Sequence, residues 1–242
     1  MCHPWLAAGV TCVLALVLVR ELGPVVRGPA GGARAADTGL LGVRLRTWFR
    51  GWVEPVVDAL LAAGLSANVV TALQLLASAL CGLAFGAGWL FTAGWLLLSC
   101  GTLDVLDGGM ARKRGAANPR GAFIDSVVDR YADGAVCAGL AVLYRDDWAL
   151  WAVLAAFVGA FMVSYTRARA EGLGTECRVG LAQRPERYVL LAAGSIAGAL
   201  GSHLACSPVP ERVLLTASVC VVAVLANATA LQRAVFVLRR LS

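Results

Sequence analysis

The sequence predicts an all-α integral membrane protein with a core of six transmembrane helices. Of its 242 residues, 59% are apolar and 15% are charged, whereas about 25% of the residues in an average soluble domain are charged. One helix needs about 20 predominantly apolar residues to cross a bilayer. Segments near this length recur at 66–88, 89–106, 122–144, 147–166, 188–206 and 213–238.

The first 37 residues are predicted to form a hydrophobic anchor followed by a linker. No basic residues precede the apolar segment 5–19, which favours an uncleaved anchor over a cleaved signal peptide, although AlaArgAla at 33–35 is similar to a cleavage site. Residues 28–42 are rich in Gly and Ala and indicate a linker. The membrane domain itself is expected over 38–242.

An amphipathic helix is predicted between the linker and the first core span. Residues 40–52 alternate apolar and basic side chains, a pattern typical of helices that lie on a lipid surface. We expect this helix over about 40–62, on the cytoplasmic leaflet.

Arginine and lysine predict which helix ends face the cytoplasm. Basic residues gather before the first core span, between 106 and 122, between 166 and 188 and at the C-terminus, whereas the opposite ends carry Arg145 and Arg212 alone. Short cytoplasmic segments carry such an excess, so we expect a multi-pass protein of the inner (plasma) membrane. The net charge of +6 follows from this orientation and from anionic lipid, and does not indicate nucleic-acid binding.

Four aspartates interrupt the apolar pattern within residues 104–129. Asp104 and Asp107 lie at the end of one predicted helix, and Asp125 and Asp129 lie at the start of the next. Helical residues three or four apart share a face, and the polar segment between the two pairs, with its Gly and Pro, should fold the helices back on each other. The four carboxylates are therefore expected to converge near the cytoplasmic surface.

Converging carboxylates indicate a divalent metal site. Such groups repel one another unless a cation compensates them, and an all-oxygen set of ligands suits Mg²⁺ or Mn²⁺. Two ions would use four carboxylates while holding a diphosphate. Gly108 and Ala111 leave room on the same face, and Arg112 could bind phosphate. Aspartates that are merely solvated at helix ends are the simpler alternative, but four on two converging faces make it the weaker one.

Zinc and disulfides are not expected. The eight cysteines are scattered along the chain without a CxxC pair, mostly within apolar segments. They are predicted to act as small hydrophobic side chains.

The aspartate stretch resembles the signature of the CDP-alcohol phosphotransferase (phosphatidyltransferase) family. The matching pattern is Asp104-x2-Asp107-Gly108-x2-Ala111-Arg112-x8-Gly121-x3-Asp125-x3-Asp129. The resemblance runs from about residue 50 to the C-terminus and implies a six-helix fold. It also implies that an alcohol attacks the β-phosphate of a CDP-linked lipid such as CDP-diacylglycerol and releases CMP.

The resemblance further assigns roles to individual residues. The four aspartates would hold two Mg²⁺ or Mn²⁺ ions, and Asp129 would also be the general base on the acceptor hydroxyl. Contacts to the CDP-lipid would come from Asn68, Thr71, Gly108, Ala111, Arg112 and Gly121. The family usually has Pro where this chain has Ala67, which affects the start of a helix only. A homodimer is also implied.

A second polar cluster bears on the acceptor. SerTyrThrArgAlaArgAlaGlu at 164–171, ArgProGluArg at 184–187 and an arginine inside the last apolar segment are similar to the prokaryotic phosphatidylinositol phosphate synthases, which use inositol 1-phosphate. The resemblance implies that the acceptor phosphate is bound by Ser164, Arg167, Arg169, Arg187 and Arg233. For Arg178 and Arg184, the positive-inside rule is an equally good explanation.

Two other functions remain open from the sequence. The same chemistry could use glycerol 3-phosphate or another phosphorylated polyol as acceptor, because the aspartates do not choose it. A cation transporter or channel could use clustered aspartates to bind ions in transit. That function would place the carboxylates near the middle of the bilayer, whereas the sequence places them at one end of two helices.

Overall fold

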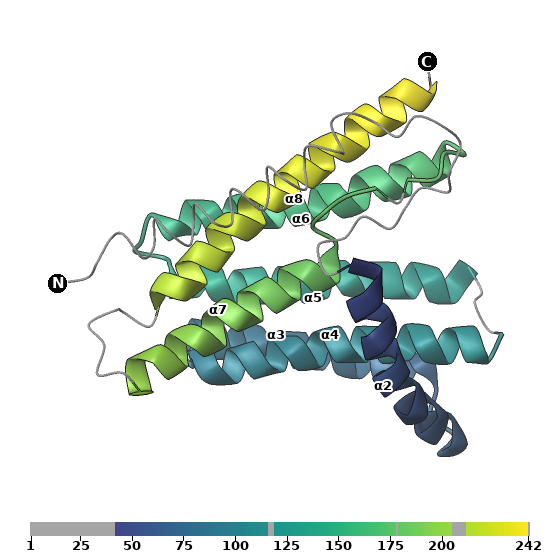
Figure 1. Ribbon diagram of the computed structural model, residues 1–242, viewed down its shortest axis with the longest axis horizontal. Helices are drawn as coiled ribbons and strands as arrows, with labels where there is room; N and C mark the ends of the chain where they lie inside the picture. Colours follow the sequence, from purple (N-terminus) through teal and green to yellow (C-terminus); the bar gives the residue numbers. More distant parts are fainter. Residues whose placement is uncertain (1–41, 116–118, 178, 205–211, 242) are drawn as a thin grey trace.

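The computed structural model describes residues 42–115, 119–177, 179–204 and 212–241, which form seven α-helices and contain no strand (Figure 1). The helices are α2 (Gly42–Ala62), α3 (Ala67–Gly86), α4 (Leu90–Lys113), α5 (Pro119–Leu143), α6 (Ala149–Gly172), α7 (Arg184–Leu204) and α8 (Arg212–Leu241). The predicted all-α class is confirmed for this part of the chain. The predicted N-terminal anchor and linker lie outside the described residues.

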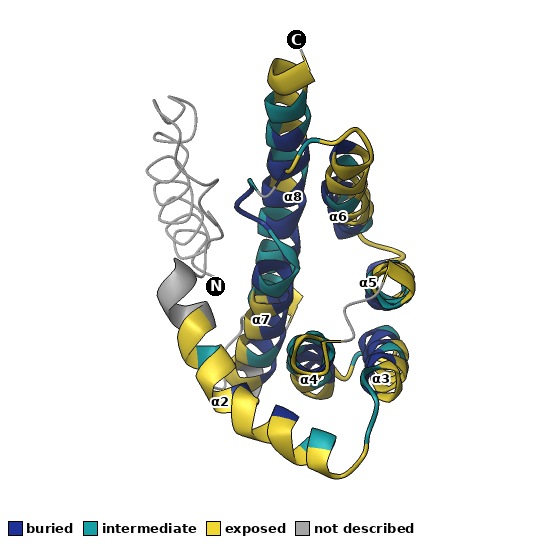
Figure 2. Cartoon of the chain, turned by 90° about the vertical axis from the view of Figure 1, so that its right-hand side faces the viewer, coloured by how far each residue is buried: buried dark blue, intermediate teal, exposed yellow. Residues whose placement is uncertain are grey.

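Helices α3 to α8 form a ring in which each helix packs against two others (Figure 2). Contacts join α3 to α4 and α5, α7 to α4 and α8, and α6 to α5 and α8. Successive helices run in opposite directions, so the C-terminal ends of α4 and α6 and the N-terminal ends of α5 and α7 lie toward the same end of the ring (Figure 1). The aspartates and the arginines of segments 164–171 and 184–187 therefore lie toward one end of the molecule.

Four of the ring helices are long and apolar enough to cross a membrane: α3, α4, α6 and α8. Helix α5 differs because every 18-residue stretch of it contains at least three charged residues, including Asp129 and Asp133. Helix α7 begins with Arg184, Glu186 and Arg187 among its first four residues. These four helices identify the chain as a membrane protein. The predicted core of six spans stays a prediction.

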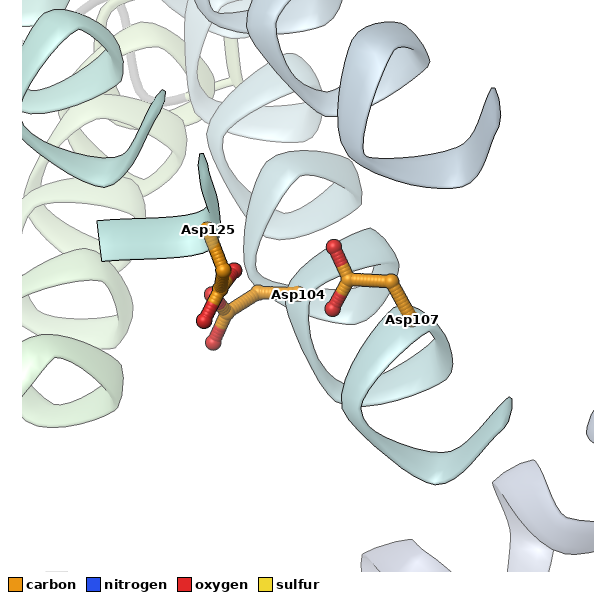
Figure 3. Close-up of side chains that lie close together, drawn as sticks. All are labelled: Asp104, Asp107 and Asp125. Carbon is orange, nitrogen blue, oxygen red and sulfur yellow. The ribbon is translucent and has the colours of Figure 1, made fainter. Parts of the chain in front are cut away.

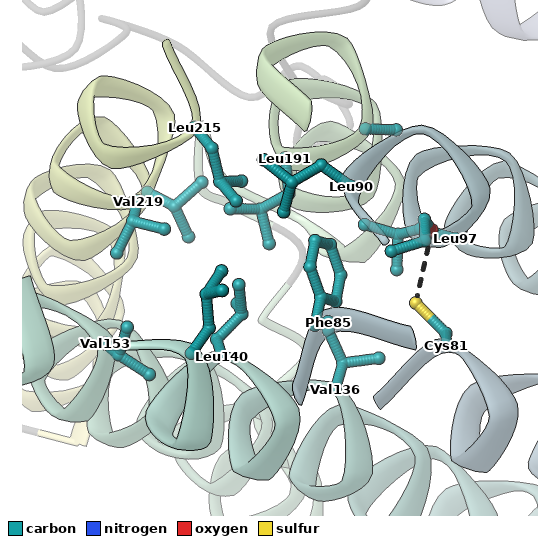
Figure 4. Packing of buried hydrophobic residues seen from close by; sticks show 14 of the residues in the cluster. Cys81, Phe85, Leu90, Leu97, Val136, Leu140, Val153, Leu191, Leu215 and Val219 are labelled. Atoms are coloured by element: carbon teal, nitrogen blue, oxygen red, sulfur yellow. Dashed lines mark hydrogen bonds between the residues drawn. The ribbon is translucent and has the colours of Figure 1, made fainter. Parts of the chain in front are cut away.

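Apolar side chains from all six ring helices fill the centre of the ring (Figure 4). They include Phe85 of α3, Leu97 of α4, Leu140 of α5, Val153 of α6 and Leu191 of α7, together with residues of α8. Lipid tails are as apolar as these side chains, so close van der Waals packing stabilises such a ring more than transfer from water does. The outer surfaces of α3, α6 and α8 expose further large apolar residues that suit contact with lipid.

Helices α3 and α5 approach closely at two glycines. A Cβ atom placed on Gly139 would lie 2.6 Å from the Cα atom of Gly82, and one placed on Gly82 would overlap the carbonyl oxygen of Ala135. Small residues at such a crossing let helix backbones pack against each other in a membrane. This crossing fixes α5 against α3 and so sets where the aspartates of α5 lie.

Helix α2 packs across α4 outside the ring. Val53 and Val57 of α2 form a cluster with Leu106 and Met110 of α4. The ammonium group of Lys113 bridges α4 to the carboxylates of Glu54, at 3.3 Å, and Asp58, at 2.7 Å. The helix covers nearly the range expected for an amphipathic helix, and its place on a membrane surface stays a prediction.

Replacing Gly139 by Ala is expected to destabilise the protein. The added methyl group meets the backbone of Gly82, and overpacking of this kind costs about 1–3 kcal/mol. The matched control is Gly134→Ala in the same helix, where the new Cβ atom would lie 4.0 Å from the Phe157 ring, an ordinary contact. Thermal unfolding in detergent should give a lower midpoint for Gly139→Ala alone; equal midpoints would mean that the crossing is not tightly packed.

Candidate active site

Three aspartates meet between the end of α4 and the start of α5. Asp104 and Asp107 project from α4 and Asp125 from α5, and one carboxylate oxygen of each lies within 4.8 Å of the others (Figure 3). Asp107 is buried, and the other two are half-buried. Helix α4 continues beyond its apolar segment to Lys113, which is why both of its aspartates lie on regular helix. The structure thus brings together three of the four predicted metal ligands.

The donor atoms of this cluster fit a divalent cation. Oδ1 of Asp125 is buried and has no hydrogen-bond partner in the described part of the chain, and the same holds for Oε1 of the buried Gln74. Unpaired carboxylate charge in a poorly solvated place is unfavourable. Oxygen donors at this separation suit Mg²⁺ or Mn²⁺.

Asp129 lies beside this cluster and outside it. Its Oδ1 atom accepts hydrogen bonds from Nε2 of Gln74, at 3.3 Å, and from Nη1 of Arg184. The same Nη1 atom donates to Oδ1 of Asp104 at 2.7 Å. The fourth predicted ligand is therefore joined to one of the other three, Asp104, through an arginine of α7.

A fifth acidic residue, Asp133, completes the network. Its Oδ1 atom accepts from Nε of Arg184, at 3.2 Å, and from the Tyr188 hydroxyl, at 2.8 Å. Its Oδ2 atom accepts from Nη2 of Arg187 at 2.7 Å. Asp133 repeats the four-residue spacing from Asp125 and Asp129, so its position on the same helical face was visible in the sequence.

The sequence prediction did not include four residues of the network: Gln74, Asp133, Arg184 and Tyr188. Gln74 lies one helical turn from Thr71 on α3, but a single buried glutamine gives no signal of its own. Arg184 was explained equally well by orientation in the membrane, and only its contacts identify it as part of the site. Tyr188, one turn further along α7, follows from Arg184 by the same spacing.

Thr71 is joined directly to the aspartates, whereas Asn68 is not. The buried hydroxyl of Thr71 donates to Oδ2 of Asp107 at 2.8 Å and lies 3.1 Å from the carbonyl oxygen of Ala67 in its own helix. Asn68 is exposed at the first turn of α3. Of the two residues predicted at this helix start, Thr71 orients a carboxylate and Asn68 remains open to a ligand.

A basic cavity lies between α2 and α4, at the end of α4 that also carries the aspartates but on another face of that helix. Its volume is about 280 Å³, and its lining includes Arg50, Arg112, Lys113 and the acidic Glu54, together with Val53, Val57 and Gly109. The guanidinium of Arg112 lies close to Gly108: a Cβ atom placed on Gly108 would be 3.3 Å from Nη1 of Arg112. Of the predicted residues, Arg112 lines this cavity, whereas Gly108 and Ala111 share the face of α4 that carries Asp104 and Asp107. Gly121 is half-buried near the start of α5. Cationic and apolar surfaces together suit the phosphates and the glycerol end of a lipid.

The predicted acceptor residues fall into an exposed and a buried group. Ser164 is half-buried on α6, Arg167 is exposed and pairs with Glu171 at 2.9 Å, and Arg169 is exposed. The first group is accessible to a soluble ligand. Arg187 is buried and is held by Asp133 of the aspartate network.

Arg233 is buried in α8 and holds the segment before α7. Its Nε atom donates to the carbonyl oxygen of Val179 at 2.7 Å, and its Nη1 atom donates to that of Val163 at 2.6 Å. Gly180, with φ of 136°, lets the backbone pass this close to Arg233. The carbonyl contacts explain how an arginine is tolerated inside an apolar helix, and they make Arg233 a support of the loop that leads to Arg184.

Cys177 lies in this same loop. Burial raises the pKa of its thiol, so the side chain stays neutral and is a poor nucleophile. Its role agrees with the prediction that the cysteines act as small hydrophobic groups.

Comparison with known proteins agrees with this geometry. Residues 65–238 match the family model of the CDP-alcohol phosphatidyltransferases. The archaetidylinositol phosphate synthase of Methanothermobacter thermautotrophicus is 35% identical over 198 residues, which cover 82% of this chain and 94% of the relative. The phosphatidylinositol phosphate synthase of Cutibacterium acnes is 38% identical over 148 residues, covering 58% of this chain and 72% of the relative.

Solved structures of the Mycobacterium tuberculosis phosphatidylinositol phosphate synthase are also similar. The crystal structure with CDP-DAG bound has a TM-score of 0.65 and 34% identity, covering 76% of this chain and 92% of the other. The crystal structure with manganese and citrate has a TM-score of 0.66 and 32% identity, covering 77% and 88%.

Replacing Thr71 by Val is expected to lower the free energy of unfolding in the absence of divalent ions. The change keeps the shape of the side chain but removes the donor to Asp107, and a hydrogen bond to a charged group contributes about 1.5–3 kcal/mol. Denaturant unfolding in detergent measures the difference. The control is Thr102→Val in α4, whose hydroxyl donates to Leu98 of its own helix; an equal loss in both variants would contradict a special role for the Thr71–Asp107 contact.

Proposed function

Because the chain belongs to the CDP-alcohol phosphatidyltransferase family and is a transferase of phospholipid synthesis, we propose that it transfers a phosphatidyl group from CDP-diacylglycerol to inositol 1-phosphate and releases CMP. The observation that carries this proposal is the meeting of Asp104, Asp107 and Asp125 between α4 and α5, at the end of α4 that also lines a basic cavity. The names of the similar enzymes support the acceptor.

Asp104, Asp107 and Asp125 would hold divalent metal, with Asp129 beside them. Bound Mg²⁺ or Mn²⁺ would neutralise charge on the diphosphate and on the CMP that leaves. Two ions would match the number of carboxylates. The manganese-containing structure of the M. tuberculosis enzyme supports the choice of a divalent ion, and Mg²⁺ and Mn²⁺ both suit the oxygen donors.

Asp129 is proposed as the general base. Its carboxylate lies next to the three clustered aspartates, so it would contact the metal and also take the proton of the acceptor hydroxyl. In the reaction the acceptor hydroxyl oxygen forms a bond to the β-phosphorus, the bond from that phosphorus to the CMP oxygen breaks, and the hydroxyl proton passes to Asp129. Gln74, which donates to Asp129, would orient the carboxylate for this transfer.

The basic cavity between α2 and α4 is proposed to receive the CDP-lipid headgroup. Arg50 and Arg112 supply positive charge, and Val53 and Val57 supply an apolar wall. Asn68, Gly108, Ala111 and Gly121 surround the same end of α3, α4 and α5 and would complete the contacts to cytidine and phosphate.

The acceptor phosphate is proposed to bind among the arginines of α6, α7 and α8. Nη1 of Arg233 donates to the carbonyl oxygen of Val163 on α6, four residues before Arg167, so these two cations lie near each other. Like charges held close together favour an anion between them. Ser164 and Arg169 on α6 would add a hydroxyl and a further guanidinium.

We also propose that the site faces the cytoplasm, at the inner (plasma) membrane, and that the enzyme is a homodimer. The excess of basic residues at the end of the ring that holds the aspartates supports the orientation. The exposed Trp48 and Trp52 on α2 support contact with a lipid surface at that end.

The full-length protein in detergent with Mg²⁺ and CDP-diacylglycerol is expected to release CMP fastest with inositol 1-phosphate. Free inositol lacks the phosphate and glycerol 3-phosphate lacks the ring, so both should react more slowly. Release of CMP measured with each acceptor tests this order. A preference for glycerol 3-phosphate would leave the transferase chemistry in place and overturn the acceptor; transport of a cation across vesicles without CMP release would overturn both.

Substitution of Arg167 tests whether the arginines bind the acceptor phosphate. Arg167→Gln should raise the KM for inositol 1-phosphate about tenfold, because a charge-assisted hydrogen bond is lost, and should leave the KM for CDP-diacylglycerol nearly unchanged. Arg145→Gln, an exposed arginine paired with Asp146 at the opposite end of the ring, is the control for net charge. Equal effects of both variants would argue against a phosphate site at Arg167.

Asp129→Asn is expected to abolish turnover and to keep CDP-lipid binding. The amide cannot accept the hydroxyl proton but has nearly the same shape as the carboxylate. Turnover is measured as CMP release, and binding is measured by calorimetry with CDP-diacylglycerol in detergent. If binding is lost to the same degree as turnover, Asp129 is chiefly a metal ligand.

A further inference from the structure

The side chain of Arg184 stands at the edge of the aspartate cluster. Only 13% of it is exposed, and each of its three guanidinium nitrogens is bound. Nη1 donates to Oδ1 of Asp104, at 2.7 Å, and to Oδ1 of Asp129. Its partners thus include one carboxylate of the three-aspartate cluster and the adjoining Asp129.

The other edge of the guanidinium is anchored away from the cluster. Nε donates to Oδ1 of Asp133 at 3.2 Å, and Nη2 donates to the Tyr188 hydroxyl at 3.0 Å. The Tyr188 ring lies under the guanidinium, 5.0 Å from ring centroid to Cζ. Asp133 is itself held by Arg187 at 2.7 Å. Two residues of the first turns of α7 and one of α5 therefore aim the Nη1 atom at Asp104 and Asp129.

We propose that Arg184 is a built-in countercation that competes with divalent metal for Asp104 and Asp129. The inference rests on the proposed metal-dependent function. Arg184 neutralises these carboxylates when no ion is bound, and it keeps α4, α5 and α7 assembled in that state. An ion that takes the Oδ1 atoms of Asp104 and Asp129 displaces Nη1 from them, while Asp133 and Tyr188 retain the rest of the side chain beside the site.

Arg184 and a divalent ion would compete because they need the same carboxylates and because both are positively charged. The atoms that Nη1 occupies are Oδ1 of Asp104 and Oδ1 of Asp129, and both residues are proposed to hold the ion. A guanidinium and a divalent ion also repel each other at short range in a site of low polarity. Binding of the ion must therefore overcome the loss of two charge-assisted hydrogen bonds, and the affinity of the free enzyme for metal is lower than the carboxylates alone would give.

A purely structural role for Arg184 leads to a different expectation. If the arginine only joined α7 to α4 and α5, its loss would loosen the carboxylates and weaken metal binding or leave it unchanged. Competition alone requires metal to bind more tightly once the guanidinium is removed. The direction of the change in affinity separates the two roles.

The test is Mn²⁺ binding to chelator-treated full-length protein in detergent, followed by the electron paramagnetic resonance signal of free Mn²⁺, without lipid or acceptor. Arg184→Gln is expected to lower the dissociation constant about tenfold or more, because two contacts to charged groups are removed. Arg184→Lys keeps the charge but cannot contact Asp104, Asp129 and Asp133 together, so a smaller decrease is expected. The lysine variant also decides the question if the glutamine variant does not fold.

Two controls separate contact from long-range charge. Arg130→Gln removes an equal charge on α5, next to Asp129, where the guanidinium donates to the carbonyl oxygen of Ser126. Arg145→Gln removes an equal charge at the far end of the ring. Tightening in the Arg184 variants that clearly exceeds both controls supports competition. Unchanged or weaker binding, or tightening no greater than in Arg130→Gln, overturns it.

The Mn²⁺ measurement also distinguishes a failure of the competition from a failure of the proposed metal centre. If the wild-type protein and the Arg184 variants all bind no Mn²⁺, both the metal centre and the competition are wrong. If the wild-type protein binds Mn²⁺ and the Arg184 variants bind it no more tightly, the metal centre stands and the competition is wrong. Binding that appears only after substitution of Arg184 supports the competition directly.

Discussion

Mutual repulsion among the carboxylates at one end of the helix ring is the constraint on which the rest of the structure depends. Asp104, Asp107 and Asp125 lie within 4.8 Å of one another, and Asp129 and Asp133 follow on the same face of α5. Such a group is stable only with compensating cations and donors. Thr71, Gln74, Arg184 and Arg187 supply part of that compensation from α3 and α7, and divalent metal would supply the rest.

The packing of the ring serves this arrangement. The close crossing at Gly82 and Gly139 fixes α5 against α3, and the contacts of α4 with α7 bring Arg184 to the aspartates. Arg233 ties the loop before α7 to α6 and α8 through backbone carbonyls. An arginine buried in the last helix therefore supports the loop that leads to the first residue of α7.

Much of the fold followed from apolar segment length, and the aspartate cluster followed from spacing. The helix at 90–113 extends seven residues beyond its apolar segment, because helical hydrogen bonds continue where the side chains become charged. What spacing could not give was the pairing across the ring: Arg184 and Asp133 lie 51 residues apart, and nothing local marks them as partners. Arg233 was linked to phosphate by its cost in an apolar helix, while its carbonyl partners depend on a loop whose path the sequence does not show.

The clustered aspartates are proposed to hold divalent metal against the diphosphate of a CDP-lipid. Crystals of the full-length protein grown with Mn²⁺ and CDP-diacylglycerol would test it through an anomalous difference map at the manganese edge. An anomalous peak is expected in contact with oxygens of Asp104, Asp107 and Asp125 and with the diphosphate. Manganese bound only elsewhere, with these three carboxylates free of metal while the lipid is in place, would contradict it.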